Sequence, residues 1–417
     1  MSRTMDATSR LRGPSGRLHY GWAVAAAGCL VMFACLGLAR FAFGILLPSM
    51  AQGLDLSYAQ RGYVGTGYFL GYLAMVAVAP RLSRRLGNVR SILLGLGLIA
   101  ATMALLGLAG TYSAALLAYT LTGVGSGAAN ISMMALVAAW FARPVRGLAA
   151  GLVIAGNGLG IVTAGFLAPA VVAAGDWRWG WLVLAGLVAL ALLAAWLVLR
   201  ESPGVMGLAM VGQDPAIPPS PAPPASIPSR ERAFLLRLGA VYSLFGLTYI
   251  VYGTFIVTTL VDEYGFGQDV AGRFWAWVGL FSLFSGALIG KLSDRKGRRL
   301  GLAAAFAMQT AAYLLAGLGD GSLALYLSVG LYGLAAWSVP TVMTAMVADR
   351  LGPERTAAGF AFITFFFAAG QVAGPALAGI LADALGGFRP AYTLSAAGAA
   401  LAALLALRLP PTAKPAR

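Results

Sequence analysis

One arginine lies deep inside a long apolar segment, where a charge needs a chemical reason. Arg40 falls within the apolar run at residues 20–47. If this run forms a helix that ends near Pro48, Arg40 lies roughly 12 Å from the helix end. A guanidinium at that depth costs at least ~2.5–3.5 kcal/mol, and it needs a partner.

The sequence offers no carboxylate at a matching depth. All 14 acidic residues fall near expected helix ends, in loops or in tails. One interpretation is that the missing anion is a substrate carboxylate, with space left on the same helix face by Gly37 and Gly44. The alternative is that Arg40 extends toward the helix end and pairs with Asp55 or Asp262.

Polar side chains near the middle of other apolar runs are candidates to complete a binding site for a small solute. The expected site is lined by Arg40, Tyr249, Tyr252, Gln371, Asn130, Asn157 and Trp337. Tyr249, Tyr252 and Gln371 are preferred, with Tyr249 opposite the arginine. The alternative role for each is a hydrogen bond between helices, which contributes about 0.6 kcal/mol.

Membrane-spanning helices must position these residues. The 417-residue chain is 59% hydrophobic and 10% charged, whereas soluble domains carry about 25% charged residues. A bilayer core of about 30 Å needs roughly 20 apolar residues per helix. Twelve such runs are found, near residues 20–47, 58–80, 89–109, 112–141, 147–172, 178–199, 233–261, 270–290, 299–317, 322–347, 356–382 and 389–408. The sequence therefore predicts an all-α integral membrane protein.

A proline-rich stretch divides these runs into six and six. Residues 204–232 hold prolines from Pro215 to Pro228 and favour an extended linker. The predicted organisation is a tail (1–19), a six-helix bundle (20–203), the linker (204–232), a second six-helix bundle (233–408) and a tail (409–417).

The two halves repeat one another at an offset of roughly 210 residues. A basic turn at 290–299 (GKLSDRKGRR) matches a second at 80–90 (PRLSRRLGNVR), each between the second and third runs of its half. Gly123 matches Gly333 and Arg146 matches Arg355 at a similar offset. The fold expected is two pseudo-symmetric bundles.

Residues 290–299 carry a known signature. They resemble the G-x-L-A-D-R-x-G-R-R pattern of the major facilitator superfamily (MFS) of secondary transporters, with Ser293 for alanine; the copy at 80–90 is degraded. Residues 37–50 (GLARFAFGILLPSM) more loosely resemble monocarboxylate porters. The resemblance implies alternating access across the membrane without an enzymatic activity.

Most of the 29 basic residues fall in loops on one side of the expected topology. The positive-inside rule then places both termini in the cytoplasm, in a multi-pass protein of the cell inner membrane, and a role in nucleic-acid binding is disfavoured. Charges on that side are expected to form a gate, whose candidates are Asp294, Arg295, Arg84, Arg85, Asp349 and Arg355. The alternative is a charged rim that only sets topology.

The leading functional hypothesis is secondary active transport of a small organic anion, such as a monocarboxylate, whose carboxylate pairs with Arg40. Symport with a proton and anion exchange both fit. Efflux of amphipathic compounds is an alternative, and a membrane sensor without transport is an alternative of another class. We expect a monomer. We also expect no cofactor or metal, since the sequence has one histidine and no phosphate-binding loop.

Overall fold

The computed structural model describes residues 18–213, 227–352 and 355–410, and these contain twelve helical spans that are long and apolar enough to cross a membrane. The first half comprises α1 (Gly21–Met32), the π-helix η2 (Phe33–Leu38), α2 (Ala39–Gly53), α3 (Tyr58–Leu86), α4 (Asn88–Gly107), α5 (Tyr112–Trp140), α6 (Arg143–Ala174), α7 (Trp177–Val198) and the short η3 (Pro203–Met206). The second half comprises α8 (Ser229–Asp262), α9 (Gln268–Lys296), α10 (Arg298–Leu318), α11 (Ser322–Ala336), α12 (Ser338–Leu351), α13 (Thr356–Leu385) and α14 (Arg389–Leu407). The segments α1, η2 and α2 form one span, as do α11 and α12.

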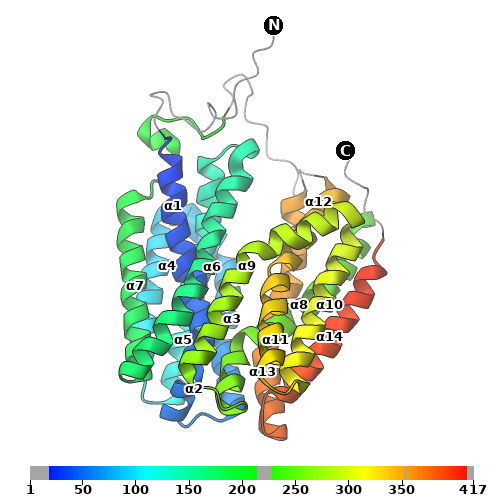
Figure 1. Cartoon of the computed structure of the whole chain (residues 1–417). Helices are drawn as coiled ribbons and strands as arrows, with labels where there is room; N and C mark the ends of the chain where they lie inside the picture. The colour runs from blue at the N-terminus through cyan, green and yellow to red at the C-terminus, as the bar shows by residue number, and fades with distance from the viewer. Residues whose placement is uncertain (1–17, 214–226, 353–354, 411–417) are drawn as a thin grey trace.

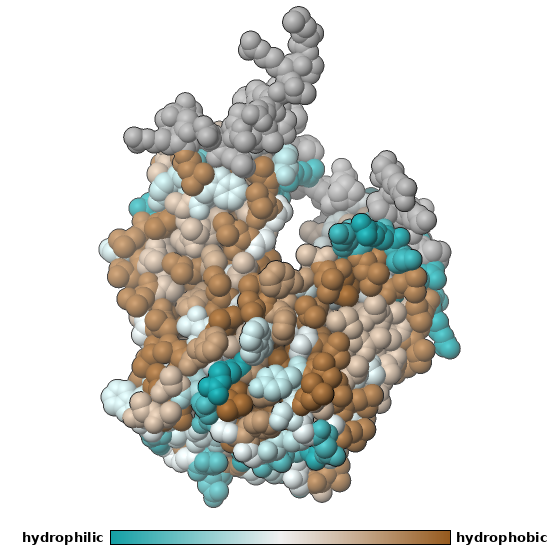
Figure 2. Space-filling view, viewed as in Figure 1, coloured by the Kyte–Doolittle hydropathy of each residue, from teal (hydrophilic) through white to brown (hydrophobic). Residues whose placement is uncertain are grey.

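The helices form two bundles that stand side by side (Figure 1). We call the side where α1 begins and α14 ends the basic face, and the side where α2 ends and α14 begins the opposite face. The space-filling view shows a cleft between the bundles that opens at the basic face, while the bundles touch lower down (Figure 2). The all-α membrane fold and its two six-helix halves are confirmed.

Glycines allow the helices of each bundle to pack closely. A Cβ atom on Gly156 would collide with the carbonyl oxygen of Cys29, and one on Gly123 with that of Tyr68. Small residues at such crossings let helix backbones approach one another in a membrane. The glycine-rich stretches of α5 and α6 therefore serve helix packing.

Two spans depart from regular α-helix where they border the contact between the halves. The first span contains the π-helical turn η2 directly before Arg40; π-helical insertions of this kind are frequent at functional sites. The tenth span breaks at Trp337, three residues before Pro340, because proline lacks an N–H and its ring clashes with the carbonyl four residues earlier. The apolar runs in the sequence had predicted an uninterrupted helix at each of these two places.

Residues 204–213 of the expected linker are ordered against the first half and do not form an extended segment. Val211 forms a backbone bridge with the end of α5, in which its N–H donates to the Trp140 carbonyl and its own carbonyl accepts from Ala142. Its side chain is buried. Helix α8 begins at Ser229, before the predicted boundary, and residues 214–226 lie outside the described residues.

Candidate functional site

Arg40 lies in the first turn of α2, where α2 meets α8 of the other half. Its Nη2 donates a hydrogen bond of 2.8 Å to the hydroxyl of Tyr249. Its guanidinium carbon lies 5.0 Å from the ring centre of Phe69, 5.1 Å from that of Phe41 and 5.6 Å from that of Tyr249. Aromatic faces attract cations, so three helices share in stabilising this charge.

These contacts leave the charge of Arg40 without a counter-ion. Arg40 forms no ion pair with any residue that the structure describes, and Asp262, a partner considered above, pairs with Arg61 instead. The Nε atom of Arg40 is buried and has no hydrogen-bond partner. Yet Arg40 stays partly accessible while rings of both halves surround it. The guanidinium therefore keeps donor capacity for an anion between the halves.

Aromatic rings of the second half extend the site beyond Tyr249. The ring of Phe245 stacks on Tyr249 at 4.9 Å, and the indole of Trp337 meets it edge-on at 6.2 Å. Trp337 also lies 6.0 Å from Phe41 of the first half. The break between α11 and α12 thus places the predicted Trp337 beside Arg40.

Two of the predicted amides are buried with unused polar atoms. Gln371 in α13 is 4% exposed and its Nε2 has no hydrogen-bond partner. It follows Phe367 by one helical turn, and the ring of Phe367 lies 6.2 Å from Tyr249. Asn157 in α6 has an unpaired Oδ1. Buried amides usually find partners, so these two are available to a ligand.

The other two predicted residues are engaged elsewhere. The Tyr252 hydroxyl lies 2.8 Å from that of Ser328, and its ring stacks on Tyr332 at 4.1 Å, inside the second bundle. The structure therefore does not bring Tyr252 to Arg40. Asn130 donates a hydrogen bond of 2.6 Å to the hydroxyl of Tyr72 in α3, which follows Phe69 by three residues and shares its helix face.

The expected space around Arg40 at Gly37 and Gly44 is filled by backbone. A Cβ on Gly37 would come within 2.6 Å of the Cα of Gly160 in α6, and one on Gly44 within 2.8 Å of the Thr254 carbonyl in α8. Both glycines serve close helix contacts. This part of the prediction was wrong because the sequence does not show which neighbour faces each glycine.

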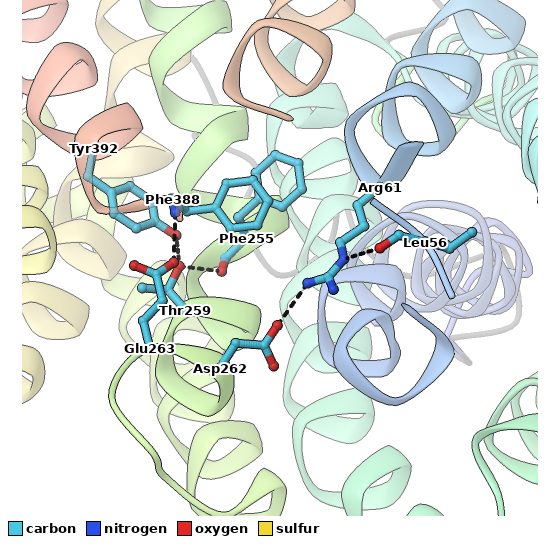
Figure 3. Close-up of polar contacts among 8 residues, drawn as sticks. All are labelled: Leu56, Arg61, Phe255, Thr259, Asp262, Glu263, Phe388 and Tyr392. Atoms are coloured by element: carbon cyan, nitrogen blue, oxygen red, sulfur yellow. Dashed lines mark hydrogen bonds and ion pairs between the residues drawn. The ribbon is translucent and has the colours of Figure 1, made fainter. Parts of the chain in front are cut away.

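Between Arg40 and the opposite face, α2 and α3 pack against α8 and α13, and we call this contact the closed seam. Arg61 of α3 pairs with Asp262 of α8 at 2.8 Å, with side chains only 13% and 18% exposed (Figure 3). The Nε atom of Arg61 donates to the Leu56 carbonyl at 3.1 Å, which fixes the guanidinium. An ion pair thus joins the two halves at this face.

The residue after Asp262 anchors that end of α8 to α14. The carboxylate of Glu263 accepts a backbone hydrogen bond from Phe388 at 2.7 Å (Figure 3) and a second from Arg389 at 3.3 Å. Burial raises the pKa of the Glu263 carboxyl, although these two N–H groups favour its ionised form. Capping the first turn of α14 in this way holds the neighbouring Asp262 in position.

Backbone contacts complete the closed seam. A Cβ on Gly62 in α3 would collide with the carbonyl oxygen of Pro375 in α13. The hydroxyl of Thr66 donates to the Val372 carbonyl at 2.9 Å and accepts from the Ala376 N–H at 3.1 Å. In a regular helix the Ala376 N–H would donate to the Val372 carbonyl. The Thr66 side chain of the first half therefore inserts into a turn of α13 in the second half.

At the basic face, the ion pairs found among the described residues stay within one half. Arg298 pairs with Asp294 and, at 2.8 Å, with Asp349, all in the second half. The sequence predicted Arg295 among these ion-paired residues, but Arg298 is the arginine that pairs with both aspartates. Arg84, Arg85 and Arg295 are exposed, and Arg355 is half-buried. A gate across the halves would form only with the cleft closed, so the predicted gate stays a prediction.

Comparison with known proteins defines the class. A family model described as an uncharacterised MFS-type transporter, YbfB, matches residues 32–407. The chain therefore belongs to the MFS-type transporter family, as residues 290–299 predicted.

Two relatives illustrate how this chain matches known transporters. A hexuronate transporter of Bacillus subtilis is 24% identical over 387 residues, covering 88% of this chain and 90% of that protein. The uncharacterised MFS-type transporter EfpA of Mycobacterium tuberculosis is 31% identical over 144 residues. This second match covers 33% of the chain and spans only 26% of EfpA.

Solved structures share the fold. A bacterial homologue of the human lysosomal transporter Spinster, in an inward-facing and unoccupied conformation, superposes with a TM-score of 0.77 at 17% identity, over 94% of this chain and 97% of that one. The nucleoside transporter NupG superposes with a TM-score of 0.74 at 12% identity, over 94% of this chain and 99% of that one. These identities support the fold and no substrate.

Proposed function

We propose that this protein is a secondary active transporter that carries an organic anion between its two halves, with Arg40 pairing with the substrate carboxylate. The observation behind the proposal is a guanidinium without a counter-ion among the described residues, held where α2 of one half meets α8 of the other. A carboxylate would supply the missing charge and accept from the free Nε. Secondary transporters bind their substrates at such an interface.

The surroundings of Arg40 favour an anion with an apolar body. Phe41, Phe69, Tyr249 and Trp337 provide ring faces, while the unpaired Nε2 of Gln371, one helical turn after Phe367, is the polar group that the described contacts bring toward Tyr249. A sugar acid needs a partner for each hydroxyl. We therefore favour a monocarboxylate with an apolar substituent over a hexuronate, although one relative is described as a hexuronate transporter.

The second candidate function is efflux of amphipathic compounds, which the same aromatic surroundings favour. A multidrug resistance protein of Proteus mirabilis matches this chain at 30% identity over 142 residues. An efflux pump of this kind would bind uncharged compounds independently of Arg40. A sensor without transport would bind a ligand and show no flux.

For the transport cycle, we propose that the basic face is cytoplasmic, which follows from the positive-inside rule. The closed seam then blocks the outer side while the cleft admits substrate from the cytoplasm. Rocking of the halves about the bound anion would open the seam and close the charged rim at Asp294, Arg298 and Asp349.

A substrate screen tests the proposal. Purified protein is heated with benzoate, phenylacetate, lactate, glucuronate and uncharged drugs, since a ligand of the native state raises its melting temperature. Counterflow in proteoliposomes then measures transport of each compound that binds. Carboxylates should bind and exchange. Binding of drugs alone would favour efflux, and binding without flux would favour a sensor.

Replacing Tyr249 by phenylalanine removes the hydroxyl that holds Arg40 and keeps the ring. Hydrogen bonds to charged groups contribute about 1.5–3 kcal/mol, so the affinity for the anion should fall about tenfold or more. The Tyr252→Phe variant is the matched control, because that hydroxyl pairs with Ser328. It should lower thermal stability and leave affinity unchanged. Equal loss of affinity in both variants would contradict this geometry.

Separating the charges of the closed seam should favour opening at the opposite face. The Asp262→Asn variant leaves Arg61 partly buried without its anion. A loss of about 1–2 kcal/mol would raise the open population five- to thirtyfold. Alkylation of a cysteine that replaces Ala59, where α3 faces Gly379 of α13, reports the opening. The exchanged pair Arg61→Asp with Asp262→Arg should restore protection. An unchanged labelling rate in Asp262→Asn would show that this ion pair does not hold the seam closed.

A further inference from the structure

A small pocket at the basic-face end of the second half combines two arginines with apolar walls. It has a volume of about 280 Å³ and lies between α8 and α14. Its lining residues are Arg237, Ala240 and Val241 of α8, with Leu405, Arg408 and Leu409 from the end of α14. Within each set, the second and third residues follow the first by three and four positions. Residues at this spacing share one helix face, so the pocket forms where one face of α8 meets one face of the end of α14.

The two arginines are free to bind an anion. Arg237 and Arg408 are exposed, and neither forms an ion pair with another described residue. Arg299 of α10 lies close by, with its Nη1 at 3.5 Å from the Leu407 carbonyl, and its buried Nε has no hydrogen-bond partner. Three guanidinium groups thus gather around the end of α14, and the pocket lining contains no acid.

The internal repeat shows that the first half supplies a carboxylate at the equivalent position. At an offset of 208 residues, Arg200 and Glu201, which follow α7, correspond to Arg408 and Leu409, which follow α14. The Glu201 carboxylate accepts from the backbone N–H groups of Asn88 and Val89 at 2.6 and 2.9 Å. In the second half the residue after Arg408 is Leu409, which is buried. No acid is among the residues that line the pocket, so an external anion can take the place that Glu201 holds in the first half.

We propose that this pocket binds an anionic phospholipid, with the headgroup phosphate between Arg237 and Arg408 and the start of an acyl chain against Ala240, Val241 and Leu405. The pocket lies at the depth expected for lipid headgroups, because Arg408 directly follows the last residue of a membrane-spanning helix. Basic pockets between helices at a membrane interface bind lipid headgroups. The apolar wall favours a lipid over a free phosphate ion, since a free ion would leave that wall exposed to water.

The test titrates detergent-purified protein with phosphatidylglycerol or phosphatidylcholine of identical acyl chains and reads melting temperature and lipid adducts by native mass spectrometry. Each basic residue near the surface contributes about 1 kcal/mol, so the double variant Arg237→Gln/Arg408→Gln should bind phosphatidylglycerol roughly 10- to 30-fold more weakly. The control Lys291→Gln/Lys296→Gln removes the same charge from exposed residues of the same face.

Three outcomes would overturn the proposal. The first is equal binding of phosphatidylglycerol by the wild type and the Arg237→Gln/Arg408→Gln variant. The second is equal loss in the lysine control, which would indicate a general surface charge effect. The third is a full melting-temperature shift with inorganic phosphate alone, which would indicate a free anion site. Because the test measures lipid binding and not substrate binding at Arg40, its result does not depend on the proposed transport function.

Discussion

Replacing Arg40 by alanine is expected to lower anion transport by roughly 30-fold to several thousandfold while the protein still inserts and folds. Truncating one partner of a desolvated charge pair costs about 2–5 kcal/mol or more, and each 1.4 kcal/mol is a factor of ten. Folding should survive, because Arg40 makes no ion pair in the described structure and burying its charge is itself unfavourable. Counterflow per mole of reconstituted protein is the measurement.

Two further variants sharpen this experiment. Arg40→Lys keeps the charge but loses the planar donor geometry that matches a carboxylate, so it should retain an intermediate activity. Arg273→Gln is the control, since Arg273 is 54% exposed and pairs only with Asp269 one turn earlier in α9. Wild-type transport in Arg40→Ala would remove the proposed anion chemistry and leave the family assignment intact.

Replacing Gly62 by alanine is expected to hold the closed seam apart and reduce transport more than tenfold. The new methyl group would collide with the Pro375 carbonyl, and backbone cannot move aside as a flexible side chain can. The contact lies between the bundles, so relief comes from separating the halves. Because an inserted methyl group in a tight contact costs about 1–3 kcal/mol, the open population should rise at least fivefold.

The Gly151→Ala variant is the matched control for Gly62→Ala. A Cβ at Gly151 in α6 would meet nothing within 4 Å. Alanine is the better helix former at both positions by about 1 kcal/mol, so propensity alone would stabilise both variants. Cysteine labelling at the opposite face should rise only in Gly62→Ala. If the labelling rates of the two variants agree, the seam glycines have no role in the conformational equilibrium.

The membrane architecture could be predicted from the sequence because it depends on properties that each segment carries alone. Length and apolar composition place a run such as 89–109 across the bilayer, and α4 spans Asn88–Gly107 in the structure. The repeat at 290–299 similarly identified the family. Irregular backbone was missed at η2 and Trp337, because the prediction assumed regular helix throughout, although Pro340 gave a signal for the break.

The candidate site was predicted in part. Arg40, Tyr249 and Trp337 come together as expected, because the repeat aligns Arg40 with Tyr249 and the pairing across halves follows from that symmetry. Tyr252, one helical turn after Tyr249, does not reach Arg40, because its hydroxyl pairs with Ser328 inside the second bundle. Phe69 was missed, because an aromatic residue in an apolar helix gives no signal of what lies next to it.

The charge pairs show the same limit. Asp294 and Arg298 are four residues apart, but α9 ends at Lys296 and α10 begins at Arg298, so the spacing rule for a continuous helix does not predict their pairing. Arg61 and Asp262 are joined only because α3 and α8 meet at the opposite face. The insertion of Thr66 into α13 depends equally on contacts between helices of different halves.

By itself, the sequence determined that this chain is a duplicated helical membrane protein with an arginine deep in its first apolar run and no acid at a matching depth, because hydropathy, repeat spacing and the positions of its acids are properties of the chain alone. The tertiary structure decided what surrounds that cation, which face is closed and which arginines remain without a partner. Those features depend on distances between helices far apart in sequence, and close packing fixes such distances residue by residue.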